Sequence, residues 1–257
     1  MTLSDLEIER YSRQLVLPEW SGEAQERLRS ASAIVIGAGA LGSPAALYLA
    51  AAGVGTVGVV DHGEVELSNL HRQPLHFTPD LELPKVTTAA VKLRALNPEV
   101  QVEEYQVRVD GGNAEAIVAG AGVVLDCSDN FDTRYVVNDA CCAQGVPLVS
   151  AAVLGFAGQL MTIVPGRSVC YRCAFATPPP PGSVPSCREA GVLGATAGIV
   201  GSMQALEALK LLAGIGRPLL DRILQLDALS LDQTLVATER LPDCPACARV
   251  PAATQSS

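Results

Sequence analysis

Residues 33–44 have the sequence AIVIGAGALGSP, in which a short apolar run leads into three glycines at Gly-x-Gly-x-x-Gly spacing. The run 33–36 predicts a buried strand, and Gly37, Gly39 and Gly42 predict a tight turn into a helix. Glycines at such a turn let the backbone approach a phosphate group and let the helix pack closely on the strand. The pattern therefore indicates a nucleotide-binding β-α-β unit.

The residues that follow complete this unit. Pro44 suits the first turn of a helix, and Gly53 suits its end. The apolar stretch 56–60 predicts a second strand, and Asp61 follows it at the distance of about 20 residues that is typical of dinucleotide-binding folds. An acidic residue there can accept a hydrogen bond from a ribose hydroxyl. Because strand, turn, helix, strand and acid occur in order, the pattern is far more specific than the glycines alone.

The composition is that of an ordinary globular protein. The chain has 257 residues, 49% hydrophobic and 18% charged, which is enough to bury a substantial core. Its net charge of −9 argues against nucleic-acid partners and against anionic membrane surfaces. The first residues lack the basic and apolar regions of a secretory signal, and the Ala/Gly-rich stretch 191–212 carries charged residues. We therefore expect a cytoplasmic protein with no membrane span.

Helical and strand patterns alternate along the rest of the chain. Helices are expected at 85–96, 131–144 and 193–212, and strands at 100–109, 122–126, 147–153, 156–164, 223–227 and 234–238. The strand at 156–164 alternates in polarity, which is typical of antiparallel pairing. The sequence predicts an α/β fold, namely a Rossmann-like mixed sheet with helices on both faces and an antiparallel second half.

We expect residues 1–250 to form a single domain. Residues 1–30 are charged and amphipathic, which predicts an N-terminal helical segment that packs on the domain or on another subunit. The segment 174–190 contains four consecutive prolines and predicts a long loop or lid. Residues 251–257 predict a disordered tail.

Two Cys-x-x-Cys pairs lie far apart in the chain, Cys170 with Cys173 and Cys244 with Cys247. Each pair can present two thiolates to one zinc ion, and four thiolates leave no open position for a substrate. We therefore predict a structural zinc site. The alternatives are a redox pair, for which the usual thioredoxin-like pattern is missing, and unpaired buried thiols.

The other cysteines and the histidines have less specific contexts. The cysteines in apolar or helical stretches are expected to be small buried residues, namely Cys127, Cys141 and Cys142. The histidines follow the second strand and are expected to have surface or loop roles, namely His62, His71 and His76.

Polar side chains gather after Asp61, where Asn69, Arg72, Gln73 and Lys85 occur. Cations aimed at a triphosphate would offset the charge that develops when a nucleophile attacks phosphorus. Hydride transfer does not need so many cations and amides, which argues against an oxidoreductase. The alternative is that Arg72 and Lys85 are solvated surface charges.

Asp129 follows the strand at 122–126, at the edge of the sheet where ligands bind in open α/β folds. Its carboxylate could hold Mg²⁺ there, or it could cap the helix that begins at Phe131. Asp126 is the rival magnesium ligand, but its place inside an apolar run indicates a structural hydrogen bond.

Together these motifs resemble the ubiquitin-activating enzyme superfamily, and in particular its MoeB/ThiF-type adenylyltransferases. The resemblance spans residues 11–247. It rests on RYSRQ at 10–14, GAGALG at 37–42, SNLHRQ at 68–73, Lys85, DCSDN at 126–130, both cysteine pairs, and CREAGVLG at 187–194.

The resemblance implies a homodimeric enzyme with ATP, Mg²⁺ and a structural Zn²⁺. Its substrate would be a ubiquitin-like sulfur-carrier protein, whose C-terminal Gly-Gly carboxylate becomes an acyl-adenylate with release of pyrophosphate. The product would serve molybdopterin, thiamine or related thio-cofactor synthesis, and we expect a separate sulfur donor protein. The alternatives are a ThiF-like dehydratase that adenylates a modified tRNA base, an NAD-dependent oxidoreductase, and a non-catalytic zinc-stapled binding module.

The resemblance also assigns roles to residues. The implied nucleotide-binding residues are Gly37, Gly39, Ala40, Gly42, Asp61, Ser68, Asn69, Arg72, Gln73, Lys85, Asp129 and Asn130. The implied catalytic residues are Arg13, Arg72, Lys85, Asp129 and Cys187, with Asp129 holding magnesium. Arg13 would reach the ATP site of the neighbouring subunit. Cys187 would either bond covalently to the carrier or be dispensable, and the sequence leaves both open.

Overall fold

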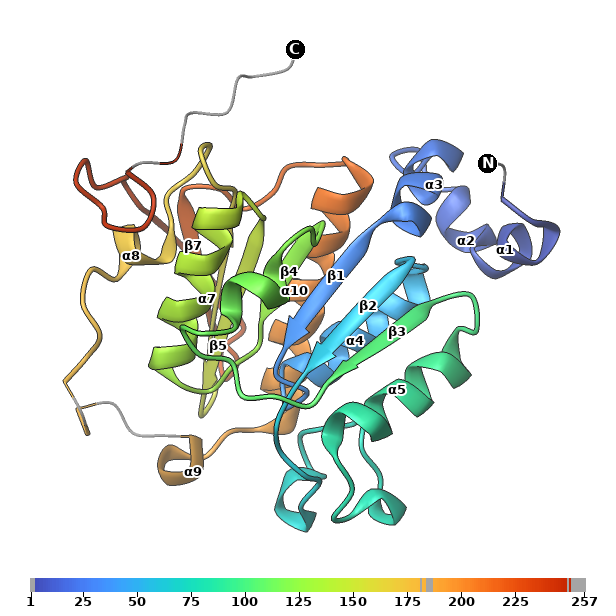
Figure 1. The fold of residues 1–257 in the computed structure, drawn as a ribbon, viewed down its shortest axis with the longest axis horizontal. Helices are drawn as coiled ribbons and strands as arrows, with labels where there is room; N and C mark the ends of the chain where they lie inside the picture. The colour runs from blue at the N-terminus through green and yellow to red at the C-terminus, as the bar shows by residue number, and fades with distance from the viewer. Residues whose placement is uncertain (1–2, 181, 184–186, 249, 251–257) are drawn as a thin grey trace.

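An eight-stranded sheet runs through the molecule in the order β3-β2-β1-β4-β5-β6-β7-β8 (Figure 1). The computed structural model describes residues 3–180, 182–183, 187–248 and 250, without the side chains of residues 187–188. The strands are β1 Ser32–Ile36, β2 Thr56–Val60, β3 Gln101–Tyr105, β4 Val123–Asp126, β5 Leu148–Leu154, β6 Ala157–Ile163, β7 Arg222–Asp227 and β8 Asp232–Ala237. The first five are parallel, and β6, β7 and β8 each pair antiparallel. The predicted mixed sheet with an antiparallel second half is confirmed.

Helices cover both faces of this sheet (Figure 1). One face packs against α4 Gly42–Ala52, α5 Lys85–Leu96 and α10 Gly194–Ala213, and the other against α6 Ala114–Val118 and α7 Phe131–Gln144. The other helices are α1 Asp5–Arg10, α2 Ser12–Leu15, α3 Gly22–Ser30, α8 Tyr171–Ala174, α9 Cys187–Ala190 and two short 3₁₀ helices at Leu67–Asn69 and Thr78–Asp80. Within the described residues, no helix is both long and apolar enough to cross a membrane.

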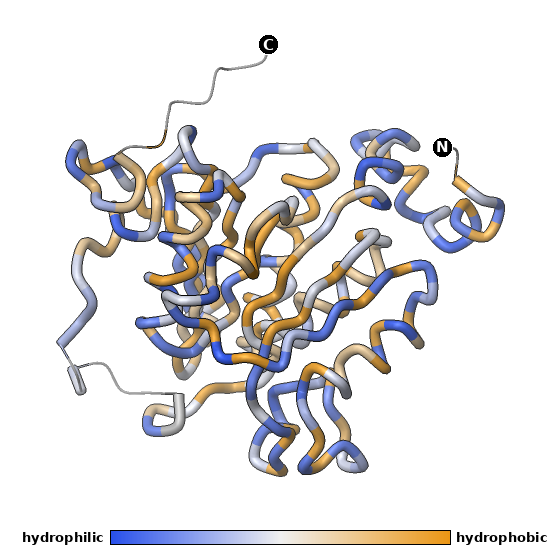
Figure 2. Tube along the Cα trace, viewed as in Figure 1, coloured by the Kyte–Doolittle hydropathy of each residue, from blue (hydrophilic) through white to orange (hydrophobic). Residues whose placement is uncertain are grey.

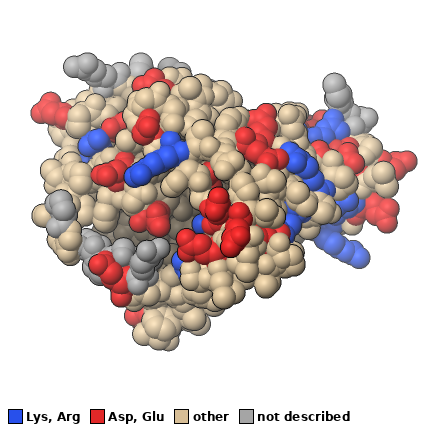
Figure 3. Space-filling model, turned by 60° about the horizontal axis from the view of Figure 1, so that its bottom comes forward, with Lys and Arg blue, Asp and Glu red and all other residues tan. Residues whose placement is uncertain are grey.

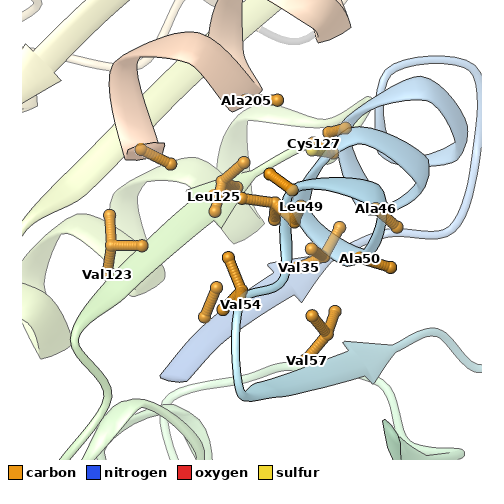
Figure 4. Packing of buried hydrophobic residues seen from close by; sticks show 14 of the residues in the cluster. Val35, Ala46, Leu49, Ala50, Val54, Val57, Val123, Leu125, Cys127 and Ala205 are labelled. Atoms are coloured by element: carbon orange, nitrogen blue, oxygen red, sulfur yellow. The ribbon is translucent and has the colours of Figure 1, made fainter. Parts of the chain in front are cut away.

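The main core lies between the sheet and α4. Leu49 of α4 packs with Val35 of β1 and Leu125 of β4, and all three are fully buried (Figure 4). Burial of each such side chain contributes about 1.5–3 kcal/mol. Figure 2 shows hydrophobic residues along β1 and β4 and hydrophilic ones along the edge strand β3. The continuous apolar runs in the sequence therefore correspond to strands that are covered on both faces.

The N-terminal segment is anchored by polar side chains at the ends of α4 and α5. The Tyr11 hydroxyl accepts a hydrogen bond of 2.9 Å from Asn97 Nδ2. Gln14 Nε2 donates to Gln25 Oε1 at 2.9 Å and to the Ala52 carbonyl at 3.3 Å. These bonds fix α2 beside the end of α4, whereas the glycine turn lies at the start of that helix.

Most expected helices and strands agree with the observed ones to within two residues, but two elements differ more and a third cannot be compared. The strand expected at 100–109 ends at Tyr105, because the Val107 N–H turns back to the Tyr105 carbonyl and residues 107–109 leave the sheet. The loop expected at 174–190 ends in the short helix α9, whose residues CREA contain no proline. The predicted disordered tail, 251–257, lies outside the described residues.

The glycine turn depends on a close approach at Gly42. A Cβ on Gly42 would lie 1.8 Å from the Gly37 carbonyl oxygen, so any side chain there must displace the turn. We expect Gly42→Ala to lower the Tm, measured by circular dichroism, by at least about 4 °C. Gly198→Ala is the matched control, because a Cβ at Gly198 on α10 meets nothing within 4 Å. It should leave the Tm equal or higher, and an equal loss in both variants would contradict this account.

Candidate nucleotide site and cysteine cluster

A cleft of about 1370 Å³ opens where the parallel strands end. Its lining includes Gly37 and Gly39 of the turn, together with Arg72, Lys85 and Asp129. Since β1 lies between β2 and β4, this edge is the topological switch point at which open α/β sheets bind ligands. Residues that are far apart in the sequence therefore meet in one concave site.

The structure brings most of the predicted nucleotide residues to this cleft. Its lining includes Gly37, Gly39, Ala40, Asp61, Arg72, Gln73, Lys85, Asp129 and Asn130. Among the described lining residues, Gly42, Ser68 and Asn69 do not occur. Arg13 is exposed on α2, at the opposite edge of the sheet. Cys187 begins α9, and its side chain lies outside the described part of the chain.

The Asp61 side chain binds the backbone of the glycine turn. Its Oδ2 accepts the Ala38 N–H at 2.8 Å, and its Oδ1 accepts the Gly63 N–H at 2.7 Å. A carboxylate has further lone pairs, so Asp61 can also accept a ribose hydroxyl. A Cβ on Gly39 would meet only the Gln73 amide, at 3.8 Å. The backbone at Gly39 is therefore open to a phosphate group.

The two cations are half-buried in the cleft wall. Arg72 Nη1 donates to the Ser68 carbonyl at 2.7 Å, and the guanidinium has further N–H donors. Lys85 begins α5, and its backbone N–H donates to the Gly63 carbonyl at 3.0 Å. The Arg72 side chain and the Lys85 backbone are thus each fixed by a contact to a backbone carbonyl, and both residues line the cleft.

Asp126 and Asp129 have opposite surroundings. Asp126 is fully buried, accepts hydrogen bonds from the Ser128 and Ser150 hydroxyls at 2.6 and 3.1 Å, and lies 3.7 Å from Arg134. The structural role predicted for Asp126 is confirmed. Asp129 is exposed in the cleft.

The cap of α7 is Asn130 rather than Asp129. The Asn130 side chain accepts the Thr133 N–H at 2.9 Å, so the alternative in which Asp129 caps this helix is wrong. Asp129 accepts one long hydrogen bond, of 3.5 Å, from Asn130 Nδ2. An exposed carboxylate of this kind suits a hard divalent cation such as Mg²⁺.

The charge around the cleft is mostly negative. Six acidic and four basic residues line it, and Figure 3 shows acidic side chains gathered around a hollow. Such a surface favours a metal-complexed triphosphate over a bare one, because the metal offsets part of the ligand charge.

Two buried side-chain amide oxygens make no hydrogen bond within the described part of the chain. Among the described residues, neither Gln73 Oε1 nor Asn69 Oδ1 has a hydrogen-bond partner, although both atoms are buried. Buried polar atoms are nearly always paired in folded proteins. A bound ligand or ordered water would supply the missing partner at Gln73, which lines the cleft.

Sequence reasoning missed the role of His76, which is buried and contacts the glycine turn. Its Nε2 lies 2.9 Å from the Ala38 carbonyl oxygen, and its Nδ1 lies 2.8 Å from Thr88 Oγ1. Burial lowers the pKa of the ring, which favours the neutral form. No pattern in the sequence marks this histidine, because its partners come from separate segments.

The four paired cysteines come together in a buried cluster, although the pairs are 74 residues apart. The Sγ atoms are 3.8 Å apart for Cys170 and Cys173, and 3.5 Å apart for both Cys170 with Cys244 and Cys173 with Cys247. Four Zn–S bonds of about 2.3 Å in a tetrahedron require separations of about 3.8 Å. The cluster therefore fits a closed zinc site.

Helix α7 holds the first cysteine pair in place. Asn138 Oδ1 accepts the Tyr171 N–H at 2.8 Å, and Arg172 forms two hydrogen bonds of 2.7 Å with the Asp139 carboxylate.

Three cysteines outside the cluster are buried. Burial raises the pKa of the Cys127 and Cys141 thiols, so both stay protonated. Together with buried Cys142, they are the small buried residues that the sequence predicts.

By fold and site, this is a Rossmann-like protein with a cleft at the carboxyl ends of its parallel strands and a separate thiol cluster. The ThiF family model matches residues 11–246, and the chain belongs to the ThiF family. Named relatives are adenylyltransferases, so the predicted enzyme class is confirmed.

Two relatives match over nearly their whole length. The "Sulfur carrier protein adenylyltransferase" of Thermus thermophilus is 50% identical over 250 residues, covering 95% of this chain and 92% of the relative. The "SAMP-activating enzyme E1" of Haloferax volcanii is 47% identical over 247 residues, covering 96% of this chain and 91% of the relative.

Other similar proteins are longer than this chain. The "Adenylyltransferase and sulfurtransferase MOCS3" of Bos taurus is 49% identical over 253 residues. The match covers 98% of this chain but only 56% of that relative. Among solved structures, E. coli MccB with ATP has a TM-score of 0.84 at 20% identity, covering 93% of this chain and 75% of MccB. This likeness shows the shared fold.

Proposed function

We propose that this protein uses ATP to adenylate the C-terminal Gly-Gly carboxylate of a ubiquitin-like sulfur-carrier protein. A terminal carboxylate oxygen attacks the α-phosphorus of ATP, the bond between the α-phosphorus and the bridging oxygen breaks, and pyrophosphate leaves. The observation that carries the proposal is the cleft that joins the open backbone at Gly39 with Arg72, Lys85 and Asp129. The identity of 50% with a sulfur-carrier adenylyltransferase supports this choice of substrate.

Each cleft residue has a role in this proposal. Asp61 accepts the ribose hydroxyl, and the glycine turn with Gln73 faces the phosphates. Arg72 and Lys85 offset the negative charge that builds up during transfer. Asp129 would hold Mg²⁺, which supplies further charge neutralisation on the phosphate oxygens.

Two further assignments depend on a second copy of the chain or on the lid. Arg13 lies at the edge of the sheet opposite the cleft, and in this proposal it reaches the cleft of a second copy in a homodimer. Cys187 either forms a covalent bond with the carrier or is dispensable for adenylation. A separate protein supplies sulfur, and the product serves molybdopterin, thiamine or related thio-cofactor synthesis.

The cysteine cluster binds a structural Zn²⁺ in this proposal. The seven cysteines with described side chains are all unbridged thiols. Such thiols suit a reducing compartment, which supports a cytoplasmic location.

ATP–pyrophosphate exchange tests the proposed reaction. We expect exchange that depends on a purified ubiquitin-like protein ending in Gly-Gly and that is lost when the last glycine is deleted. Cys187→Ala should keep exchange if the thiol acts after adenylation, and lose it if the thiol is required. Tight NAD binding or tRNA-stimulated ATP hydrolysis, with no carrier-dependent exchange, would contradict the proposal.

A further inference from the structure

Both backbone groups of Ala38, the residue between the first two glycines of the turn, are held by side chains. Asp61 Oδ2 accepts its N–H at 2.8 Å. On the other side, His76 Nε2 lies 2.9 Å from its carbonyl oxygen. Since a carbonyl only accepts hydrogen bonds, His76 must carry its proton on Nε2. Two side chains from the segment that follows β2 therefore hold the turn, one through its N–H group and one through its carbonyl.

The other nitrogen of His76 connects the turn to α5. Nδ1 lies 2.8 Å from Thr88 Oγ1, and that hydroxyl lies 3.1 Å from the Lys85 carbonyl. His76 and Thr88 are 2% and 4% exposed, so water does not compete for these bonds. Hydrogen bonds thus run from the glycine turn, through the imidazole, to Thr88 in the first turn of α5.

The surroundings of His76 contain charges of both signs. Lys85 and Lys92 of α5 act on the ring from one element, and Asp61 and Asp80 from the adjoining loops. Desolvation is the main influence on the ring, and it favours the neutral form. A neutral ring donates from Nε2 and accepts at Nδ1, so in this state the Thr88 hydroxyl donates its single proton to Nδ1 and not to the Lys85 carbonyl.

We propose that His76 is a positioning residue for the phosphate site, which sets the distance between the glycine turn and the start of α5. This inference rests on the proposed function, because it concerns ATP. The turn offers its backbone to the phosphates and Lys85 offers a cation, so correct spacing between them strengthens ATP binding. His76 does not line the cleft, and it acts through Ala38 and Thr88.

Direct measurement of ATP binding separates this role from general stability. Isothermal titration calorimetry with Mg²⁺ and a non-hydrolysable ATP analogue needs no carrier. His76→Phe replaces the imidazole with a flat ring that has no nitrogen, and it should raise the Kd for the analogue about tenfold, the effect of one or two lost buried hydrogen bonds. His76→Gln places a donor near the position of Nε2 and should restore binding to within about threefold of the unaltered protein, whereas His76→Asn should not.

Two threonine variants complete the experiment. Thr88→Val removes the hydroxyl through which His76 contacts α5, and it should weaken binding about threefold. Thr162→Val is the matched control, because the Thr162 hydroxyl is also buried but bonds to Glu207 at 2.7 Å and does not line the cleft. It should lower the Tm and leave the Kd unchanged.

The outcomes distinguish the two proposals. Unchanged Kd values for His76→Phe and Thr88→Val, or a glutamine variant as weak as the phenylalanine variant, would overturn the positioning role while ATP binding itself stands. Absence of analogue binding by the unaltered protein would overturn the proposed function, and the inference with it.

Discussion

Replacing Asp129 with alanine should lower the rate of carrier-dependent ATP–pyrophosphate exchange by about 100- to 1000-fold. The Asp129 carboxylate is exposed in the cleft and neither caps α7 nor supports the core, as Asn130 and Asp126 do. The variant should therefore keep the Tm of the unaltered protein. The loss should come from weaker magnesium binding, so raising the Mg²⁺ concentration should recover part of the rate.

Asp132→Ala is the matched control for this prediction. Asp132 is also exposed and lies three residues further on, in the first turn of α7, but it does not line the cleft. Its loss removes a favourable charge at a helix N-terminus and should change the Tm only slightly. Equal exchange rates in the two variants would contradict a specific role for Asp129.

Replacing Cys247 with serine should remove the bound metal and lower the Tm by roughly 10 °C. The cluster joins residues 170–173 to residues 244–247, and all four thiols are buried. Without a cation, these close-packed thiols cannot all ionise. The segment that carries Cys244 and Cys247 then loses its main attachment to the rest of the protein. We expect one Zn²⁺ per chain in the unaltered protein by elemental analysis, and much less in the variant.

Cys141→Ala provides the comparison for the zinc site. Cys141 is fully buried on α7 but is not a member of the cluster. The alanine variant should retain zinc and lose only a small part of its stability. A metal-free unaltered protein with the same Tm before and after chelation would rule out a structural zinc ion.

Elements with strong local signals could be predicted from the sequence. Helices α5 and α7 begin and end at the residues expected, because Pro84 and Asn130 lie at their starts and Asn97 and Gly145 follow their last residues. The central strands were equally clear, since their apolar runs are buried on both faces. The cysteine pairs could be joined because tetrahedral metal sites need four ligands.

Features that depend on distant partners were not accessible in this way. Val107 and Val109 continue the alternation of β3, yet the chain turns out of the sheet after Tyr105 to reach the cleft. His76 gains its role only when the glycine turn and α5 come together on either side of it. Local patterns carry no information about such long-range contacts, which the packing of the whole sheet decides.

The separation of the two cysteine pairs also has a consequence for how the chain is made. Cys244 follows Cys170 by 74 residues, which at about 5–20 residues per second takes roughly 4 to 15 s to synthesise. During this interval the first two thiols exist on a growing chain whose other two cysteines of the cluster have not yet been translated. The cluster can therefore close only late in synthesis, after all eight strands of the sheet have been produced.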